Sequence, residues 1–413
     1  MPHMSNDASG AMSSPDSMPS ALKNPESTKL QVVIVTDHAE FAAFEDAWNA
    51  TARQVDTPSV FLSHEWFNAA WAWRRLDSTL DTLIAREAGR VVGILPLIRN
   101  RHPRDGSRRL ELLTVPDTQL CDLIAASGDL PDVTEAFAAT LAARHDWDTL
   151  QLDYLLPHGA SIRSFLPALV RHGLRFDDRD GGRNPFVALN GTWNDYYDRR
   201  SRSLKKASNL AANRLKKAGE IRVEWLAANT LDESHYRRAL DGVIDISRRS
   251  WKRETGNTLD QPGPQAFIRS LSRAAYEQGW LSLWLIYVNE QPLAMEYQLV
   301  YGGDVHALRA DFDTNCKEIS PGSHLFRHLL ERLFGHGLRR YYMGPGENPY
   351  KKRWTDKGEP LRRVTVYNRT LRGRLAWFRE VVLKPILRTM RDRFTNPKKA
   401  AREDKPAENN ANH

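Results

Sequence analysis

Ser320-Pro321-Gly322-Ser323 precedes an amphipathic run with apolar residues at helical spacing. A helix that begins here leaves its first backbone N–H groups without intrahelical acceptors, and these groups attract phosphate. Gly322 allows a ligand to approach the backbone, and Ser320 or Ser323 is suited to cap the helix. The same residues are also ordinary turn formers. The segment predicts either a capped helix start or an anion site at Ser320, Gly322, Ser323 and His324.

A second segment, GPGENPYKKRW (344–354), predicts a shaped loop that presents aromatic and cationic side chains together. Tyr350 is suited to act as a general acid toward a leaving thiolate. Lys351, Arg353 and Trp354 are suited to bind an anionic substrate. Aromatic packing and solvated cations explain the same residues equally well, so both interpretations stay open.

Two carboxylates in the same part of the chain are candidate general bases. Within the apolar strand predicted from Leu293 to Tyr301, Glu296 and Gln298 share one face. Glu296 is therefore either a proton acceptor or the partner of an arginine such as Arg309. Asp311 ends the next predicted strand, beside the segment that begins at Ser320, and is the other candidate.

The elements around these residues predict a mixed fold. Two β-hairpins of similar layout are expected, over 82–98 with a turn at 87–90 and over 282–301 with a turn at 289–291. Their shared layout suggests an internal duplication. The second is followed by a strand, a helix, a strand, a loop and a final strand, which indicates an α/β (α+β) chain with a largely antiparallel sheet.

Composition narrows the class of protein. The 413 residues exceed what one core usually holds, and no apolar run reaches the ~20 residues of a membrane span. The two cysteines lack CxxC partners, which argues against a metal site. The net charge of +8 suits an anionic partner such as a phosphate-bearing cofactor, a nucleic acid or a lipid headgroup. The leader has no secretory signal, and a cytoplasmic protein is expected.

Two basic segments have several interpretations. The predicted helix over 199–219 has cations and no acidic residue, which fits a solvated face, an RNA-binding face, or a surface for a lipid-linked saccharide or a membrane. The segment 371–394 interleaves apolar and basic residues, and Pro385 should kink or divide it. It fits either an interfacial anchor at the membrane or a helix that covers the second domain.

From about Tyr196 to Trp354 the chain resembles the CelD/BcsL-type acetyltransferases, a GNAT branch associated with cellulose and exopolysaccharide synthesis. Four segments carry the resemblance: the basic run SLKKASNLAANRLKKAG, the hairpin around Asn289, the SPGS segment with its helix, and the final segment YKKRW. FLSHEW (61–66) resembles the opening segment of the family. The layout is similar to that of Fem-type aminoacyltransferases, which carry two tandem GNAT folds. An Asp common in relatives is missing from 341–343.

The resemblance implies two tandem GNAT-like domains, over 30–183 and 184–370, each a mixed, largely antiparallel sheet flanked by helices. A disordered leader (1–29), a basic amphipathic helix (371–395) and a disordered tail (396–413) complete the expected organisation. The first domain is expected to have lost cofactor binding and to form one wall of the acceptor cleft.

The implied activity is acyl transfer from acetyl-CoA or another acyl-CoA, without a metal, to an amine or hydroxyl of a saccharide acceptor. Glu296, Asp311 and Tyr350 would be catalytic, and Ser320, Gly322, Ser323 and His324 would bind the cofactor. Lys351, Arg353 and Trp354 would bind the acceptor. The alternatives are an aminoacyl-tRNA-dependent transferase of the Fem type, with tRNA as a partner, and a non-catalytic accessory protein. Peripheral contact with the inner face of the membrane through the C-terminal helix is the further expected partner.

Overall fold

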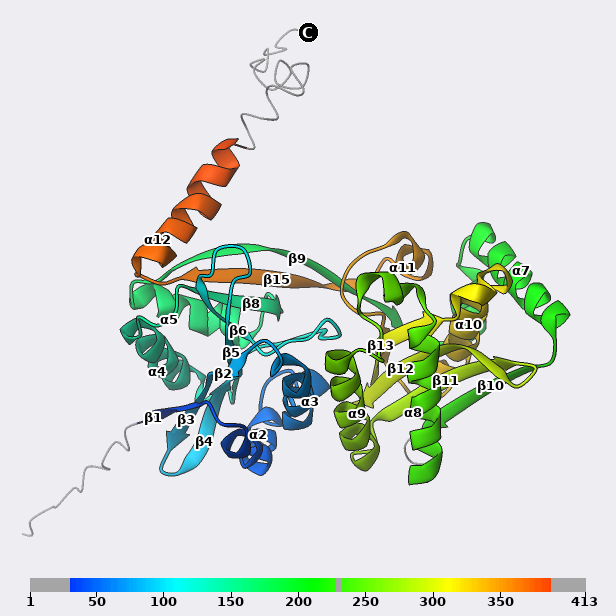
Figure 1. Ribbon diagram of the computed structural model, residues 1–413, viewed down its shortest axis with the longest axis horizontal. Coiled ribbons are helices and arrows are strands. Elements are labelled where there is room, and N and C mark those ends of the chain that lie inside the picture. The colour runs from blue at the N-terminus through cyan, green and yellow to red at the C-terminus, as the bar shows by residue number, and fades with distance from the viewer. Residues whose placement is uncertain (1–29, 228–231, 388–413) are drawn as a thin grey trace, which may run out of the picture.

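The computed structural model describes residues 30–227 and 232–387. The predicted leader and tail lie outside the described residues, as does 388–395 of the predicted C-terminal helix. Figure 1 shows two lobes that lie side by side and share two long strands, β9 (Arg175–Ala188) and β15 (Gly358–Tyr367). We call them the first lobe (β1 to α5) and the second lobe (α6 to α11).

The first lobe contains thirteen helices and strands and two short helical turns. They are β1 (Gln31–Val35), α1 (His38–Ala42), α2 (Glu45–Ala52), a 3-10 turn (Val60–Leu62), α3 (His64–Arg74), β2 (Thr79–Leu80), β3 (Thr82–Glu87), β4 (Arg90–Leu95), β5 (Leu97–Arg101), β6 (Arg108–Leu112), β7 (Ile124–Ala125), α4 (Leu130–Ala143), β8 (Thr149–Leu155), a π-helical turn (Ser161–Phe165) and α5 (Leu166–Arg171).

The second lobe is built around the second predicted hairpin, which forms the strands over 281–288 and 291–301. Its elements are α6 (Trp193–Asp198), α7 (Arg202–Ala218), β10 (Ile221–Ala227), α8 (Glu233–Arg248), η4 (Trp251–Thr255), α9 (Pro262–Glu277), β11 (Leu281–Val288), β12 (Gln291–Tyr301), β13 (Asp304–Phe312), η5 (Thr314–Ile319), α10 (Pro321–Leu333), β14 (Arg340–Tyr342) and α11 (Pro349–Trp354). After β15 follow α12 (Leu371–Trp377) and the π-helical turn η6 (Phe378–Leu383).

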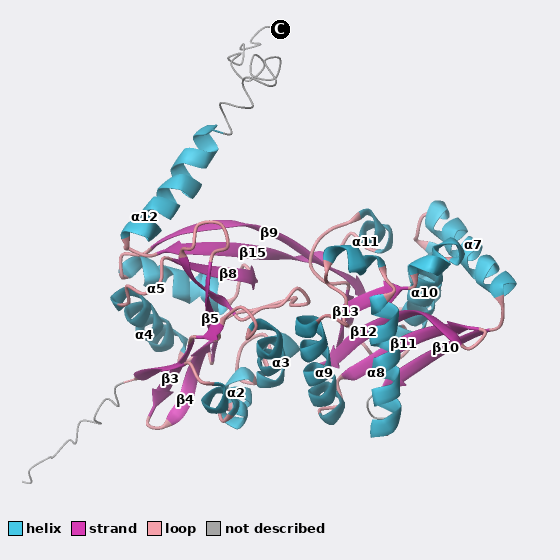
Figure 2. Ribbon diagram, viewed as in Figure 1, coloured by secondary structure: helices cyan, strands magenta, loops and turns pink. Residues whose placement is uncertain are grey.

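One mixed sheet runs through both lobes, with helices on its faces (Figure 2). Its strand order is β10-β11-β12-β13-β14-β9-β15-β8-β6-β5-β2, and a separate sheet of β1-β3-β4-β7 completes the first lobe. Most pairs are antiparallel, but β13 pairs parallel with β14, and β6 with β8. In each lobe a helix, α10 or α4, connects the two parallel strands. This repeated connection supports the internal duplication predicted from the hairpins.

Both predicted hairpins are confirmed. Ala88 and Gly89 join β3 to β4, and Asn289 and Glu290 join β11 to β12, all with positive φ. Two-residue turns with this backbone match the twist of the strands that they connect. The extended run after the first hairpin turn ends at Leu95, where Pro96 separates β4 from β5 and the chain enters the large sheet.

The predicted loop over 344–354 is wrong in its second part, because residues 349–354 form α11. Asn348 caps this helix by accepting a hydrogen bond from the Lys351 N–H at 2.9 Å, and Pro349 occupies its first turn. Both are favourable at these positions. The charged strand β9 was not predicted. The proposed domain boundary between 183 and 184 falls inside β9 and stays a prediction.

The lobes share a continuous hydrophobic core. Helices α3 and α9 pack closely, with Trp66 against Phe267 at a ring distance of 5.4 Å. A Cβ on Gly263 of α9 would lie 2.3 Å from the Trp73 ring, so only glycine allows this approach. The contact fixes α9, and with it the α8–α9 connection that lines the cleft described below.

The C-terminal helix does not cover the second domain, so this part of the expectation is wrong. It begins after β15 at the first lobe and extends away from the body of the protein (Figure 1). The helix turns π-helical over Phe378–Leu383, just before Pro385, which lacks an N–H for the regular ladder. Among the described residues, no helix is long and apolar enough to cross a membrane.

Candidate active site

The turn into α10 leaves backbone donors open. Ser320 takes the left-handed conformation (φ 54°, ψ 52°), and Pro321 begins the helix without an N–H group. Within the described residues, the N–H groups of Gly322 and Ser323 have no hydrogen-bond acceptor. The first turn has no acidic side chain, and Ser320 occupies the capping position without a side-chain bond to the helix. An anion fits these donors.

The four residues predicted to bind the cofactor all lie at this turn, and solvent reaches it. Ser323 is exposed, while Ser320, Gly322 and His324 are half-buried. A Cβ on Gly322 would meet the Phe312 ring at 3.4 Å, so the packing leaves room for alanine. Burial lowers the pKa of His324 to about 4, and the nearby side chains of His328, Arg327 and Lys216 act in the same direction. His324 is therefore neutral at neutral pH.

The basic helix α7 lies beside this turn. Its apolar face packs on the second lobe through Leu204, Ala211 and Leu215. Arg214 donates a hydrogen bond to the carbonyl oxygen of Glu318 at 3.1 Å, two residues before Ser320. The cations of its last turns thus lie close to the open donors of α10, where they add to the attraction for an anion.

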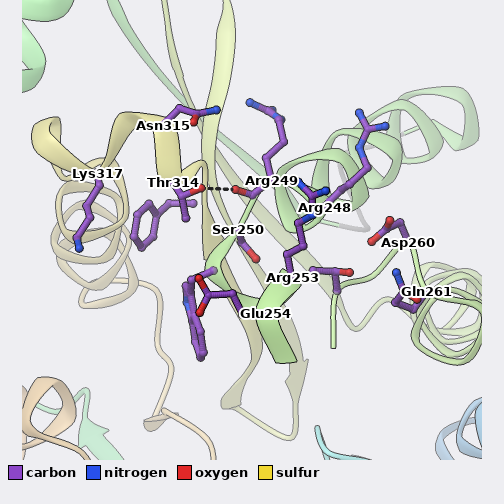
Figure 3. A pocket seen from close by; sticks show the side chains of 13 residues that line it. Arg248, Arg249, Ser250, Arg253, Glu254, Asp260, Gln261, Thr314, Asn315 and Lys317 are labelled. Atoms are coloured by element: carbon purple, nitrogen blue, oxygen red, sulfur yellow. Dashed lines mark hydrogen bonds between the residues drawn. The ribbon is translucent and has the colours of Figure 1, made fainter. Parts of the chain in front are cut away.

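An open cleft of about 1010 Å³ lies next to η5, the segment that leads into α10 (Figure 3). Its walls are the α8–α9 connection, the end of β13 and η5. Four cations line it, Arg248, Arg249, Arg253 and Lys317, against two acidic residues, Glu254 and Asp260. All of its lining residues belong to the second lobe, so the expected wall from the first domain is not found at this cleft.

The cations of the cleft differ in their partners. Arg249 is bound to Asp313 and Asp245, and Arg248 to Asp245. Figure 3 shows Thr314 bonded to the Arg249 carbonyl, which ties η5 to the end of α8. Within the described part of the chain, Arg253 and Lys317 have no acidic partner. These two were not predicted, although the polar run SRRSWKRETGN (247–257) between two helices is a signal for them.

Asp311 lies behind the cleft in an ion pair. Its carboxylate accepts a hydrogen bond from Ser247 at 2.9 Å and lies 2.8 Å from the Lys252 ammonium group. On the same face of β13, Arg309 pairs with Asp117 of the first lobe at 2.7 Å. The expected Glu296–Arg309 pair is therefore wrong, because Arg309 forms its ion pair with Asp117, which is far away in the sequence.

Glu296 lies on the opposite face of the sheet. Asp311 is paired with Met295 across β12 and β13, so neighbouring Glu296 points to the other side, toward α10. It accepts hydrogen bonds from Tyr341 at 2.5 Å and Gln298 at 2.7 Å. Burial raises the pKa of Glu296 to about 7, against the two hydrogen bonds, which lower it. The two candidate bases do not come together.

The residues of α11 have different surroundings. The Lys351 ammonium group donates to the carbonyl oxygens of Gly344, Pro345 and Gly346 at 2.7, 3.2 and 3.1 Å, and burial lowers its pKa to about 8. Lys351 thus holds the preceding loop together. Trp354 is buried against Phe326.

Tyr350 also contacts Phe326, at a ring distance of 5.5 Å, and 39% of the residue is exposed. Burial of its phenol and the nearby Glu296 carboxyl raise the pKa of Tyr350 above its usual value. It is therefore protonated at neutral pH and able to donate a proton. Arg353 is exposed.

The helix of the first lobe that corresponds to α10 begins in an acidic environment. Asp129 precedes α4, Asp132 lies in its first turn, and Ser127 beside it is bonded to Asp56. Carboxylates at a helix start disfavour a bound phosphate. The two lobes therefore differ in the charge that they present at this point of the fold. No cluster of three metal-ligating side chains occurs in 30–227 or 232–387.

Comparisons with known proteins bear on the fold. Residues 202–352 match the family model described as the acetyltransferase (GNAT) domain. Among solved structures, the chain is similar to the C-terminal domain of a protein assigned as a lysylphosphatidylglycerol synthetase from Agrobacterium fabrum, with 14% identity and a TM-score of 0.51 over 83% of this chain and 97% of that one. A conserved protein of unknown function from Bacteroides thetaiotaomicron aligns with 12% identity and a TM-score of 0.50, over 82% of this chain and 100% of that one.

The crystal structure of FemX aligns with 11% identity and a TM-score of 0.49, over 80% of this chain and 96% of that one. The alignments with TM-scores of 0.51 and 0.50 show a shared fold and nothing about substrates. A search of curated proteins found no significant match. The chain therefore has a mixed α/β fold that it shares with these two solved structures, and its residues 202–352 match the GNAT-type acetyltransferase domain.

Proposed function

We propose that this chain transfers an acyl group from acetyl-CoA or another acyl-CoA to an amine or hydroxyl of a saccharide used in exopolysaccharide or envelope synthesis. The saccharide acceptor rests on the resemblance to the CelD/BcsL-type enzymes alone. The observation that carries the acyl-CoA donor is the open start of α10, where two N–H groups lack acceptors within the described chain, beside a cation-lined cleft. Two amides, with nearby cations that have no acidic partner in the described residues, suit a diphosphate.

Bound acyl-CoA supplies an activated thioester, so the protein has to position the acceptor and move protons. The N–H groups of Gly322 and Ser323 would hold the phosphates, with Lys317 and Arg253 adding positive charge from the cleft. Tyr350, protonated at neutral pH, would donate a proton to the departing thiolate.

Of the two carboxylates, we assign the proton acceptor to Glu296. Its pKa of about 7 matches the operating pH of a general base, whereas the Asp311 carboxylate is held in an ion pair with Lys252. Glu296 is buried and bonded to Tyr341, so a proton would reach it through the Tyr341 hydroxyl rather than by direct contact with the acceptor.

Calorimetric titration with acetyl-CoA and longer acyl-CoAs tests the donor, and release of free thiol in the presence of amino sugars tests the transfer. We expect saturable binding of at least one acyl-CoA and thiol release that depends on the acceptor. The absence of binding to every acyl-CoA by the folded protein would overturn the proposal. Binding without transfer, unchanged by Y350F, would favour the accessory role.

One observation favours a second candidate, an aminoacyl-tRNA-dependent transferase. Lys206, Lys216 and Lys217 of α7 are exposed and have no ion pair among the described residues, and Lys216 lies near the start of α10. Such a face suits the phosphates of RNA. Salt-sensitive tRNA binding that disappears when Lys205, Lys206, Lys216 and Lys217 are neutralised would support this candidate. Lys205 alone should matter least, because Asp198 already pairs with it.

A further inference from the structure

The C-terminal helix, α12 with η6, has an apolar side that nothing covers in the described chain. It extends from the first lobe into solvent (Figure 1). Its large apolar side chains are exposed over several turns. The exposed ones are Leu371, Leu375, Phe378, Leu383, Ile386 and Leu387, and Leu371, Leu375, Phe378 and Ile386 recur at helical spacing on one side. An exposed apolar stripe of this length marks a surface that contacts another apolar phase.

The base of this helix is fixed to the body of the protein. Thr370 caps α12 by accepting from the Gly373 N–H at 3.0 Å, and its hydroxyl donates to Asp148 at 2.8 Å. A Cβ on Gly373 would lie 2.4 Å from the Asn368 carbonyl oxygen, so the first turn lies directly on the chain beneath it. The Arg175 guanidinium lies 4.4 Å from the centre of the Trp377 ring. The exposed stripe is therefore held in one orientation.

Positive charge borders the apolar stripe. Arg372 and Arg374 are exposed, and in the described chain neither has an acidic partner. The sequence continues to be basic beyond the described residues, so the stretch 371–399 contains nine lysines and arginines against two acidic residues, a net charge of +7. Most of the chain's net charge of +8 is thus concentrated in this segment.

We propose that α12 and η6 dock on an anionic phospholipid surface, with the apolar stripe in the interfacial region and the arginines at the headgroups. This combination is that of an interfacial amphipathic helix. A second copy of the chain is the less suitable occupant, because pairing of two such helices would bring their like charges together. The inference does not depend on the proposed acyl transfer.

Co-sedimentation of the full chain with lipid vesicles tests it. One set contains phosphatidylcholine alone, and the other contains phosphatidylglycerol as about a third of the lipid. We expect binding to the anionic vesicles that weakens with salt. The double variant L375E/F378E should reduce it at least tenfold, and R372Q/R374Q by a smaller factor. The matched control is L76E, because Leu76 is an equally exposed leucine outside this helix.

Three outcomes would overturn the inference. The first is a wild-type chain that stays in solution with both vesicle types. The second is binding that L375E/F378E and L76E leave equally unchanged. The third is a dimer in light scattering that L375E/F378E dissociates without any effect on vesicle binding, which would assign the stripe to a second copy. Acyl-CoA binding measured without lipid should be the same in all these variants, so failure of this inference is distinguishable from failure of the proposed function.

Discussion

At the scale of single residues, the proposed donor site uses the backbone of Gly322 and Ser323 and not their side chains. Their N–H groups lie in the first turn of α10, where no carbonyl oxygen of the helix can reach them. A substitution that keeps the N–H group should therefore leave the site intact, and a substitution that removes it should not. This separates the anion site from an ordinary well-capped helix start.

Ser323→Pro removes one of the two N–H groups at a first-turn position that proline tolerates. We expect it to weaken acyl-CoA binding by about tenfold or more, because a hydrogen bond to a charged group is lost. Ser323→Ala keeps the N–H group and should bind nearly as the wild type does. Calorimetric titration measures both. Equal affinities in the two variants would show that this amide does not contact the donor.

Because the pKa of Glu296 is raised, we expect the stability of the protein to depend on pH. This pKa is about 7 in the folded chain, against an ordinary value of 4.5. As the pH rises from about 4.5 to 7, the carboxyl ionises in the unfolded chain before it does in the folded one. The free energy of unfolding should therefore fall over this window, by up to roughly 3 kcal/mol. Below the window the contribution of Glu296 is fully present.

Glu296→Gln removes this titration while keeping an oxygen that accepts from Tyr341. Urea unfolding near pH 5 and near pH 8 measures it. The variant should gain stability relative to the wild type on going from the lower to the higher pH. If the difference between the two proteins is the same at both pH values, Glu296 does not titrate in this window.

At the scale of elements, the sequence predicted those whose pattern is local. The two hairpins and α10 follow from apolar periodicity and turn residues, and the structure has them close to the predicted bounds. Strand β9 was missed because its residues are charged and its partners, β14 and β15, come more than 150 residues later. The partner of Arg309 was missed for the same reason, since Asp117 comes from the other lobe.

Two helical glycines make a matched pair of tests. A Cβ on Gly263 would lie 2.3 Å from the Trp73 ring, whereas a Cβ on Gly242 of α8 would meet Leu285 at an ordinary 3.6 Å. Gly263→Ala should destabilise the protein by roughly 1–3 kcal/mol. Gly242→Ala should stabilise it by up to about 1 kcal/mol, because alanine favours the helix. Urea unfolding compares them, and a shift of the same sign in both would refute the close α3–α9 contact.

At the scale of the whole molecule, a buried ion pair joins the two lobes. Asp117 of the first lobe and Arg309 of the second lie 2.7 Å apart, and both side chains are almost fully buried. Burial raises the pKa of Asp117, and Arg309 acts against this shift. The first lobe therefore supports the sheet of the second from behind the cleft, although it does not line the cleft itself.

Asp117→Ala should destabilise the chain by about 3 kcal/mol or more, because it leaves Arg309 buried without its counterion. The double variant D117L/R309M replaces the pair by apolar groups and should lose much less stability. Chemical unfolding of both gives the comparison. A double variant that is as unstable as D117A would mean that the lost stability comes from shape and not from the unpaired charge.

The central claim is that the backbone N–H groups at the start of α10 bind the phosphates of the donor. The most direct measurement is the amide signal of Gly322 in glycine-labelled protein, assigned through its loss in G322A. Coenzyme A should shift this signal, and pantetheine, which has the same arm without the phosphates, should not. A Gly322 signal that coenzyme A leaves in place, or that both compounds move equally, would contradict the claim.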